Sequence, residues 1–262
     1  MNGFEGIMRP AENSNAAVGI ICKTPTVGTS KTRLAPVLGA EGAAELAVAF
    51  LRDVAAAIEA VPACAMRRGY AVYAPEGSEA GLRPLLPASF GLVCRRGATL
   101  EGVLLGATQE LLLAGHDCVI LVNGDSPTLP PITISAAMAA LRRSGDRAVF
   151  GPASDGGYYL IGLKVAHAEL FRDIPWSTTE TLAVTLERAR EIGLEVALLP
   201  MWYDIDDEET LRLLMSDIEG RPLPFDHGDL QAGPARATRR FLAARPHLTA
   251  GSAFHFKETA TR

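Results

Sequence analysis

Short apolar runs alternate with segments of helical periodicity from Ala17 onward, and this alternation constrains the fold more than any other feature. The strand-like runs are AVGIIC, YAVYA, GLVC, CVILVN, the pair within AVFGPASDGGYYLIGLK, and EVALL. Helical patterns lie between them, near residues 46–61, 100–113, 130–143, 179–191 and 208–218. Such alternation predicts a parallel sheet with helices on both faces. Because two strands follow each other directly around Asp155, we expect a three-layer α/β/α sandwich with a mixed, mostly parallel sheet.

Composition shifts at the two ends predict the domain organisation. Residues 1–15 are polar and aperiodic, so we expect a flexible N-terminal tail. Residues 16–220 form the predicted main domain. Residues 221–262 are rich in Pro, Gly and Arg and predict a C-terminal extension with one short helix.

The charge balance excludes some functions. A formal net charge of -5 argues against a protein that coats nucleic acid, which needs a surplus of Lys and Arg. No run approaches the ~18 apolar residues of a membrane span, and the first residues lack the apolar middle of a signal peptide. We therefore expect a cytoplasmic enzyme that binds any anion locally.

The loop after the first strand collects basic and hydroxyl side chains. Ligands of open α/β sheets bind beyond the carboxyl ends of the strands, and this loop lies there. Its candidate phosphate-binding residues are Lys23, Gly28, Thr29, Ser30, Lys31, Thr32 and Arg33. The spacing matches neither G-x-x-x-x-G-K-[ST] nor G-x-G-x-x-G, so a solvated loop with incidental charges is the alternative.

Aspartates at other strand ends are candidate metal ligands. Asp125 follows the most apolar strand, where a carboxylate could hold Mg²⁺ or Mn²⁺ facing phosphates. Its alternative is a turn residue before Pro127. Asp204, Asp206 and Asp207 precede a helix, and one could complete the metal site. The competing interpretation is that Asp206 caps that helix with Glu209.

A glycine turn and a tryptophan complete the candidate residues. Asp155, Gly156, Gly157 and Tyr158 could line a substrate pocket, although a tight turn between strands explains the glycines equally well. Trp176 could stack on a base or sugar, and its alternative is a core anchor. The five histidines show no ligand spacing.

Five segments together resemble a known family. KTPTVGTSKTRLAPVLG, GDSPTLP, GPASDGGYYLIGL, DIPWST and DIDDEETL occur in this order. They resemble a bacterial family of GT-A-fold glycosyltransferase-like proteins in the nucleotide-diphospho-sugar transferase superfamily, long known as a domain of unknown function. The resemblance spans about residues 17–220. The segment GATLEGVLLGATQELL departs from the family's Gln-Gly and Gly-Glu-Arg pattern, and Asp207 replaces its usual Thr.

The resemblance implies a metal-dependent transferase that binds a nucleotide diphosphate. Lys23, Lys31 and Arg33 would hold the phosphates, Asp125 and Asp206 would be the metal ligands, and Asp155 would be a candidate acceptor base. Asp125, Lys31 and Asp155 are thus the expected catalytic residues. The partners would be a nucleotide sugar and a small acceptor.

Two other functions remain open. Weaker similarity to 2-phospho-L-lactate guanylyltransferases indicates nucleotidyl transfer from a nucleoside triphosphate to a phosphorylated acceptor, with release of pyrophosphate. A nucleotide-binding protein without turnover is the third possibility.

Overall fold

The computed structural model describes residues 15–62, 67–95, 97, 99–246 and 248. Within them, seven strands form one sheet in the order β3-β2-β1-β4-β6-β5-β7. Strand β6 is antiparallel to its neighbours β4 and β5, whereas the other neighbouring strands are parallel. The strands are β1 (Ala16–Lys23), β2 (Arg67–Ala74), β3 (Gly91–Cys94), β4 (Cys118–Asn123), β5 (Arg147–Pro152), β6 (Tyr158–Leu163) and β7 (Glu195–Leu198). The predicted mixed, mostly parallel sheet is confirmed.

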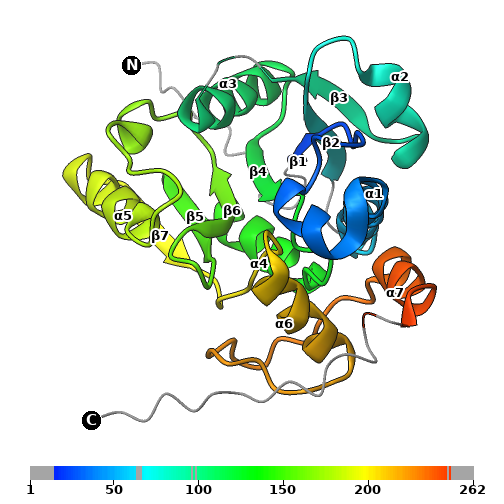
Figure 1. Cartoon of the computed structure of the whole chain (residues 1–262). Helices are drawn as coiled ribbons and strands as arrows, with labels where there is room; N and C mark the ends of the chain where they lie inside the picture. Colours follow the sequence, from blue (N-terminus) through cyan, green and yellow to red (C-terminus); the bar gives the residue numbers. More distant parts are fainter. Residues whose placement is uncertain (1–14, 63–66, 96, 98, 247, 249–262) are drawn as a thin grey trace, which may run out of the picture.

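Helices cover both faces of this sheet (Figure 1). They are α1 (Ala35–Glu59), α2 (Glu79–Leu82), α3 (Leu100–Leu113), α4 (Pro131–Arg142), α5 (Thr181–Glu191), α6 (Glu208–Ile218) and α7 (Arg236–Ala243). Short 3₁₀ turns are Thr32–Leu34, Arg83–Leu85 and Glu169–Phe171.

Two hydrophobic cores follow from the alternation of side chains along the strands. One core joins β-strand residues such as Ile20 and Ile120 to α1, α4, α6 and α7. The other joins Val119 and Leu121 to α3 and α5. Successive strand residues point to opposite faces, so each central strand feeds both cores. The predicted three layers are confirmed.

The first helix differs most from its expected extent. It begins at Ala35, with Pro36 in its first turn, and is interrupted at Gly39, whose φ of 72° is not helical. With the preceding 3₁₀ turn it is long and apolar enough to cross a membrane by length and composition alone. Its residues Phe50, Val54 and Ile58 are fully buried against the sheet, as in the core helix of a globular domain.

The C-terminal region packs onto the core. The predicted short helix is α7, and the buried Asp53 of α1 accepts hydrogen bonds from the backbone N–H groups of Ala237 (2.9 Å) and Thr238 (2.7 Å). Phe241 and Leu242 join the core beside α1. Residues 1–14 of the expected flexible tail, predicted as 1–15, lie outside the described residues, and the N–H of Asn15 donates to Asp117 at 2.8 Å.

Candidate active site at the carboxyl edge of the sheet

The carboxyl ends of β1 and β4 bring the predicted site residues together. The two strands are parallel with Ile21 opposite Asn123, so both chains leave the sheet at the same edge. Asp125 comes two residues after β4, and its carbonyl oxygen accepts the N–H of Ile205 at 3.0 Å. The strand-end aspartate therefore lies beside the segment that leads into α6.

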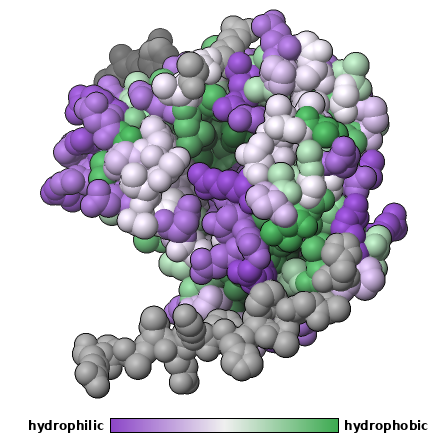
Figure 2. Space-filling view, in the orientation of Figure 1, coloured by the Kyte–Doolittle hydropathy of each residue, from purple (hydrophilic) through white to green (hydrophobic). Residues whose placement is uncertain are grey.

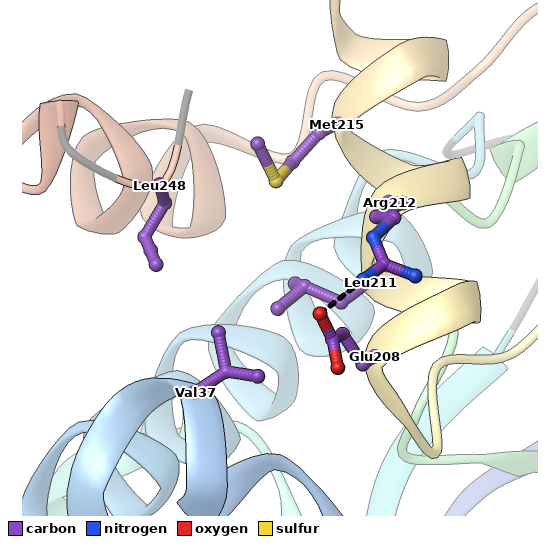
Figure 3. A pocket seen from close by; sticks show the side chains of 6 residues that line it. All are labelled: Val37, Glu208, Leu211, Arg212, Met215 and Leu248. Atoms are coloured by element: carbon purple, nitrogen blue, oxygen red, sulfur yellow. Dashed lines mark hydrogen bonds and ion pairs between the residues drawn. The ribbon is translucent and has the colours of Figure 1, made fainter. Parts of the chain in front are cut away.

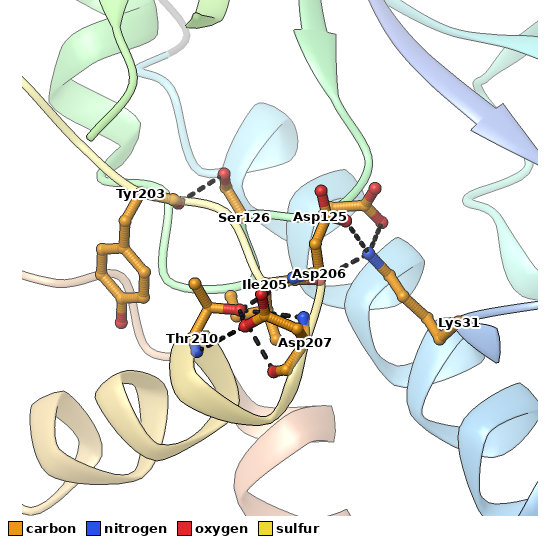
Figure 4. Close-up of polar contacts among 8 residues, drawn as sticks. All are labelled: Lys31, Asp125, Ser126, Tyr203, Ile205, Asp206, Asp207 and Thr210. Atoms are coloured by element: carbon orange, nitrogen blue, oxygen red, sulfur yellow. Dashed lines mark hydrogen bonds and ion pairs between the residues drawn. The ribbon is translucent and has the colours of Figure 1, made fainter. Parts of the chain in front are cut away.

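Lys31 lies between two of the predicted carboxylates. Its Nζ is 2.8 Å from Oδ1 of Asp125 and 3.1 Å from Oδ1 of Asp206, and it also donates to the carbonyl of Ile205 (Figure 4). The Lys31 side chain is 9% exposed, against 42% for Asp125 and 51% for Asp206. Burial alone lowers the pKa of the Lys31 ammonium, but the two carboxylates outweigh burial and raise that pKa.

The backbone at Lys31 explains how its side chain reaches inward. Lys31 has φ 47° and ψ 45°, the left-handed conformation, just before the 3₁₀ turn that leads to α1. This conformation costs a non-glycine residue ~1–2 kcal/mol, which the contacts of the ammonium offset.

The helix cap differs from the sequence interpretation. Asp207, and not Asp206, caps α6: its carboxylate accepts the N–H of Thr210 at 3.0 Å, and the Thr210 hydroxyl accepts the N–H of Asp207 at 3.1 Å. The interpretation with Asp206 and Glu209 is therefore wrong, because the helix begins at Glu208 and Asp207 is the residue directly before it. The hydrogen bond from the Thr210 backbone lowers the pKa of Asp207. Asp206 keeps its carboxylate available to face Lys31.

Buried hydrogen bonds fix the segment that carries Asp204 and Asp206. Ser126, fully buried, donates from its hydroxyl to the carbonyl of Tyr203 at 2.7 Å (Figure 4). The Tyr203 hydroxyl in turn donates to Asp217 of α6 at 2.6 Å. These contacts tie the segment before α6 to the end of β4 and to the C-terminal end of α6, so the spacing of the two carboxylates is set by rigid elements.

Asp204 is a residue for which the sequence offered no role beyond that of a possible metal ligand. Burial, and then the neighbouring Asp155, Asp206 and Asp125, raise its pKa to about 7. Four carboxylates therefore share this part of the edge, with Lys31 as their cation. The DIDD spacing was visible in the sequence, but burial of its first aspartate was not.

The rest of the basic loop is turned outward. Lys23 and Arg33 are exposed. The Ser30 hydroxyl accepts the N–H of Thr26 at 2.8 Å, and Thr29 donates to the Thr26 carbonyl, so these hydroxyls fold the loop onto itself. Gly28 has φ +83° and Thr32 begins the 3₁₀ turn.

The Asp155 turn lies near Asp204 and has the geometry of the tight-turn alternative. Asp155 Oδ1 accepts the N–H of Gly157 at 2.8 Å. Gly156 has φ +91°, and a Cβ there would meet the carbonyl oxygen of Thr179 at 2.3 Å. Glycine is thus required at position 156 because the backbone of Thr179, and not a ligand, approaches it closely.

The two aromatic residues predicted for the pocket pack together. The rings of Tyr158 and Trp176 are 6.3 Å apart, and Tyr158 also contacts Phe150 at 5.2 Å between centroids. Both Tyr158 and Trp176 are packed against the second core. The geometry agrees with the core-anchor alternative for Trp176.

One cation at this edge was missed. Arg95 directly follows β3, and its N–H donates to the carbonyl of Tyr73 at 2.8 Å. The Cys22 thiol is affected by both Asp125 and Arg95. Burial and then Asp125 raise its pKa to about 12, whereas the positive charge of Arg95 lowers it. The β3 end is thus cationic and the β4 end anionic. Only the strand order could have shown that β3 and β1 share this edge.

The surface reflects this arrangement. Hydrophilic residues gather near the centre of the face that Figure 1 presents, beside a hollow (Figure 2). A separate small groove lies beside the start of α6 (Figure 3) and is lined by Val37, Glu208, Leu211, Arg212, Met215 and Leu248. It contains none of the predicted site residues.

The donor set suits a divalent cation that is shared with a substrate. Among the described residues, no three His, Cys, Asp or Glu side chains are grouped to hold a metal ion. Asp125 and Asp206 nevertheless both contact one positive charge, the Lys31 ammonium, which occupies the position that a metal ion bound to both carboxylates would take. Mg²⁺ commonly takes one or two carboxylates and completes its shell with water and substrate phosphates. The two residues therefore fit such an ion.

Comparison with known proteins agrees with the predicted resemblance. The family described as "Uncharacterized protein conserved in bacteria (DUF2064)" matches residues 54–178. A candidate nucleotide-diphospho-sugar transferase from Desulfovibrio desulfuricans G20 is 26% identical, with a TM-score of 0.71, over 88% of this chain and 96% of that chain. This chain has the nucleotide-diphospho-sugar transferase fold. The predicted resemblance is confirmed at this level.

More distant proteins share this nucleotide-diphospho-sugar transferase fold. CMP:2-keto-3-deoxy-manno-octonic acid synthetase, solved with CTP, has a TM-score of 0.53 at 10% identity, covering 79% of this chain and 99% of its own. A cytidylyltransferase from Leptospira borgpetersenii serovar Hardjo-bovis (strain JB197) also gives 0.53 at 10% identity, covering 93% and 100%. No protein with a curated description matches the chain.

Proposed function

We propose that this protein is a metal-dependent transferase that uses a nucleotide sugar and binds its diphosphate at the carboxyl edge of the sheet. The observation that carries the proposal is the convergence of Lys31 on Asp125 and Asp206, contributed by three segments far apart in the sequence. The similarity to the Desulfovibrio protein supports a nucleotide-diphospho-sugar substrate. A cytoplasmic location remains a prediction from the sequence.

The chemistry is electrostatic. The bond between the sugar's anomeric carbon and the diphosphate oxygen breaks, and an acceptor oxygen bonds to that carbon. When bound, Mg²⁺ or Mn²⁺ on Asp125 and Asp206 would neutralise charge on the departing diphosphate. Lys23, Lys31 and Arg33 stabilise the same charge from the loop side.

The acceptor must lose a proton as its oxygen attacks. Asp155 is the proposed base, because one of its oxygens is engaged by Gly157 and the other is left to accept the proton. Asp204 lies close to Asp155, because the charge of Asp155 raises the pKa of the Asp204 carboxyl. Tyr158 and Trp176 have a structural role in this proposal. Tyr158 of β6 packs against Trp176 and against Phe150 of β5, and these contacts hold the strands beside the turn in place.

Nucleotidyl transfer is the second candidate. In it, a phosphorylated acceptor attacks the α-phosphate of a nucleoside triphosphate and pyrophosphate leaves. The observation that favours it is Arg95, which adds a fourth cation to the edge that carries Lys23, Lys31 and Arg33, and a triphosphate carries more charge than a diphosphate.

One assay separates these functions. The protein is incubated with Mg²⁺, a panel of nucleotide sugars or nucleoside triphosphates, and small acceptors, and released nucleoside diphosphate and pyrophosphate are measured. Nucleoside diphosphate released from a nucleotide sugar supports glycosyl transfer, whereas acceptor-dependent pyrophosphate supports the second candidate. Nucleotide binding without any product indicates a binding protein.

A matched pair of variants ties the product to this site. Asp125→Asn should abolish product formation. Asp117→Asn should not, because Asp117 precedes β4 at the opposite edge, where it accepts the N–H of Asn15. Equal activity of the two variants would place the chemistry elsewhere.

A further inference from the structure

The position of Lys31 conflicts with a simple phosphate-binding role. Its ammonium makes three contacts within the protein: two aspartate oxygens and the Ile205 carbonyl. Its side chain is almost fully buried, and Nζ also lies 5.7 Å from the centroid of the Phe50 ring. An ammonium in this position is satisfied before any phosphate arrives.

We infer that Lys31 is an internal counter-ion that excludes a divalent cation from Asp125 and Asp206 until a diphosphate group is bound. The inference rests on the proposed function, because it assumes that these two carboxylates hold the metal. It adds an order to binding: metal and phosphate enter together, because the ammonium occupies Oδ1 of both carboxylates until then.

Charge and geometry at the two Oδ1 atoms favour this competition. The ammonium already uses Oδ1 of both aspartates, so a cation that bridges those oxygens must displace it or lie in repulsive contact with it. Displacement also breaks the bond to the Ile205 carbonyl. Metal binding alone therefore loses three contacts of Lys31.

A diphosphate changes the balance. Its oxygens offer the displaced ammonium new charge-assisted partners and supply the ligands that the two aspartates lack. Each partner then strengthens the binding of the other, and this coupling is reciprocal. Lys31 lies in the loop directly before the 3₁₀ turn, outside the strands, so its side chain can move to a phosphate without a change in the strand ends.

The test measures Mn²⁺ binding, which does not depend on catalysis. Mn²⁺ is titrated against the full chain and followed by electron paramagnetic resonance, with and without inorganic pyrophosphate as the diphosphate probe. For the wild type, we expect weak Mn²⁺ binding alone and at least about tenfold tighter binding with pyrophosphate, which corresponds to ~1.4 kcal/mol.

Variants identify Lys31 as the cause. Lys31→Met should bind Mn²⁺ alone at least about tenfold more tightly than the wild type, and adding Asp206→Asn should remove that gain. Lys31→Arg keeps the charge and should retain the low affinity. Arg190→Met, on α5 and outside the proposed site, is the control for loss of one exposed positive charge. Its effect on Mn²⁺ binding should be less than about threefold, since exposed charges are screened.

The outcomes separate the two ideas. If Lys31→Met and the wild type bind Mn²⁺ equally well without pyrophosphate, the counter-ion role is refuted while the metal site stands. If no variant binds Mn²⁺ under either condition, the metal assignment of the proposed function fails and the inference fails with it. Thermal melting of each variant by circular dichroism verifies that binding is compared between folded proteins.

Discussion

Replacing Asp204 with asparagine should stabilise the protein at neutral and alkaline pH. The folded state raises the pKa of Asp204 from 3.8 to about 7, first through burial and then through the neighbouring carboxylates. Between these values the folded protein holds a proton that the unfolded chain has released. The free energy of unfolding therefore falls as the pH rises through this window, and the loss is complete above about pH 7.

The magnitude follows from the size of the shift. Each pKa unit corresponds to ~1.4 kcal/mol, so a shift of about three units sets an upper limit of ~4 kcal/mol. Asp204 is only partly buried, and water and salt screen part of this cost. We expect Asp204→Asn to gain about 2 kcal/mol at pH 8 and little near pH 4, where Asp204 is largely protonated in both states.

Urea unfolding followed by circular dichroism at several pH values measures this difference. EDTA is included, because a bound metal would stabilise the ionised carboxylate. Groups outside the carboxylate cluster contribute equally to both proteins, so the difference between them reports on Asp204 and on its coupling to Asp155, Asp206 and Asp125. A gap between the two unfolding free energies that stays constant from pH 4 to pH 8 would refute the argument.

Two further substitutions test the packing that supports the site. Asp53→Ala should destabilise the protein by about 2 kcal/mol in urea unfolding, because it removes the charged acceptor of two N–H groups at the start of α7; no loss of stability would show that this contact is dispensable. Gly156→Ala should cost more than about 2 kcal/mol, since it adds a clash with Thr179 to a positive φ. Gly193→Ala is its control, with φ +66° and open space, and should cost only ~1 kcal/mol; equal losses for the two glycines would contradict the clash.

Local patterns in the sequence were sufficient for most of the fold. Apolar runs and helical spacing depend on neighbouring residues, so α3, β4 and α6 were predicted at their observed bounds. The mixed sheet followed from two adjacent strands without a helix between them. The first helix was harder, because the kink at Gly39 interrupts the period.

Features of the site that depend on long-range contacts could not be predicted. The sequence indicated that Lys31 and Asp125 belong to one site, but the partner of the ammonium is set by a left-handed backbone and by a segment 174 residues away. Asp207 caps α6 in place of the predicted Asp206, because the hydroxyl of Thr210, three residues after Asp207, completes the capping box. Arg95 joins the site only through the strand order.

Mg²⁺-dependent nucleotide binding tests the central claim most directly. Nucleoside di- and triphosphates are titrated calorimetrically into the wild type and Asp125→Asn, each with Mg²⁺ and with EDTA. The account predicts that Mg²⁺ tightens binding to the wild type and has no effect on the folded variant. Nucleotide binding that is unchanged both by Mg²⁺ and by the loss of the Asp125 carboxylate would contradict it.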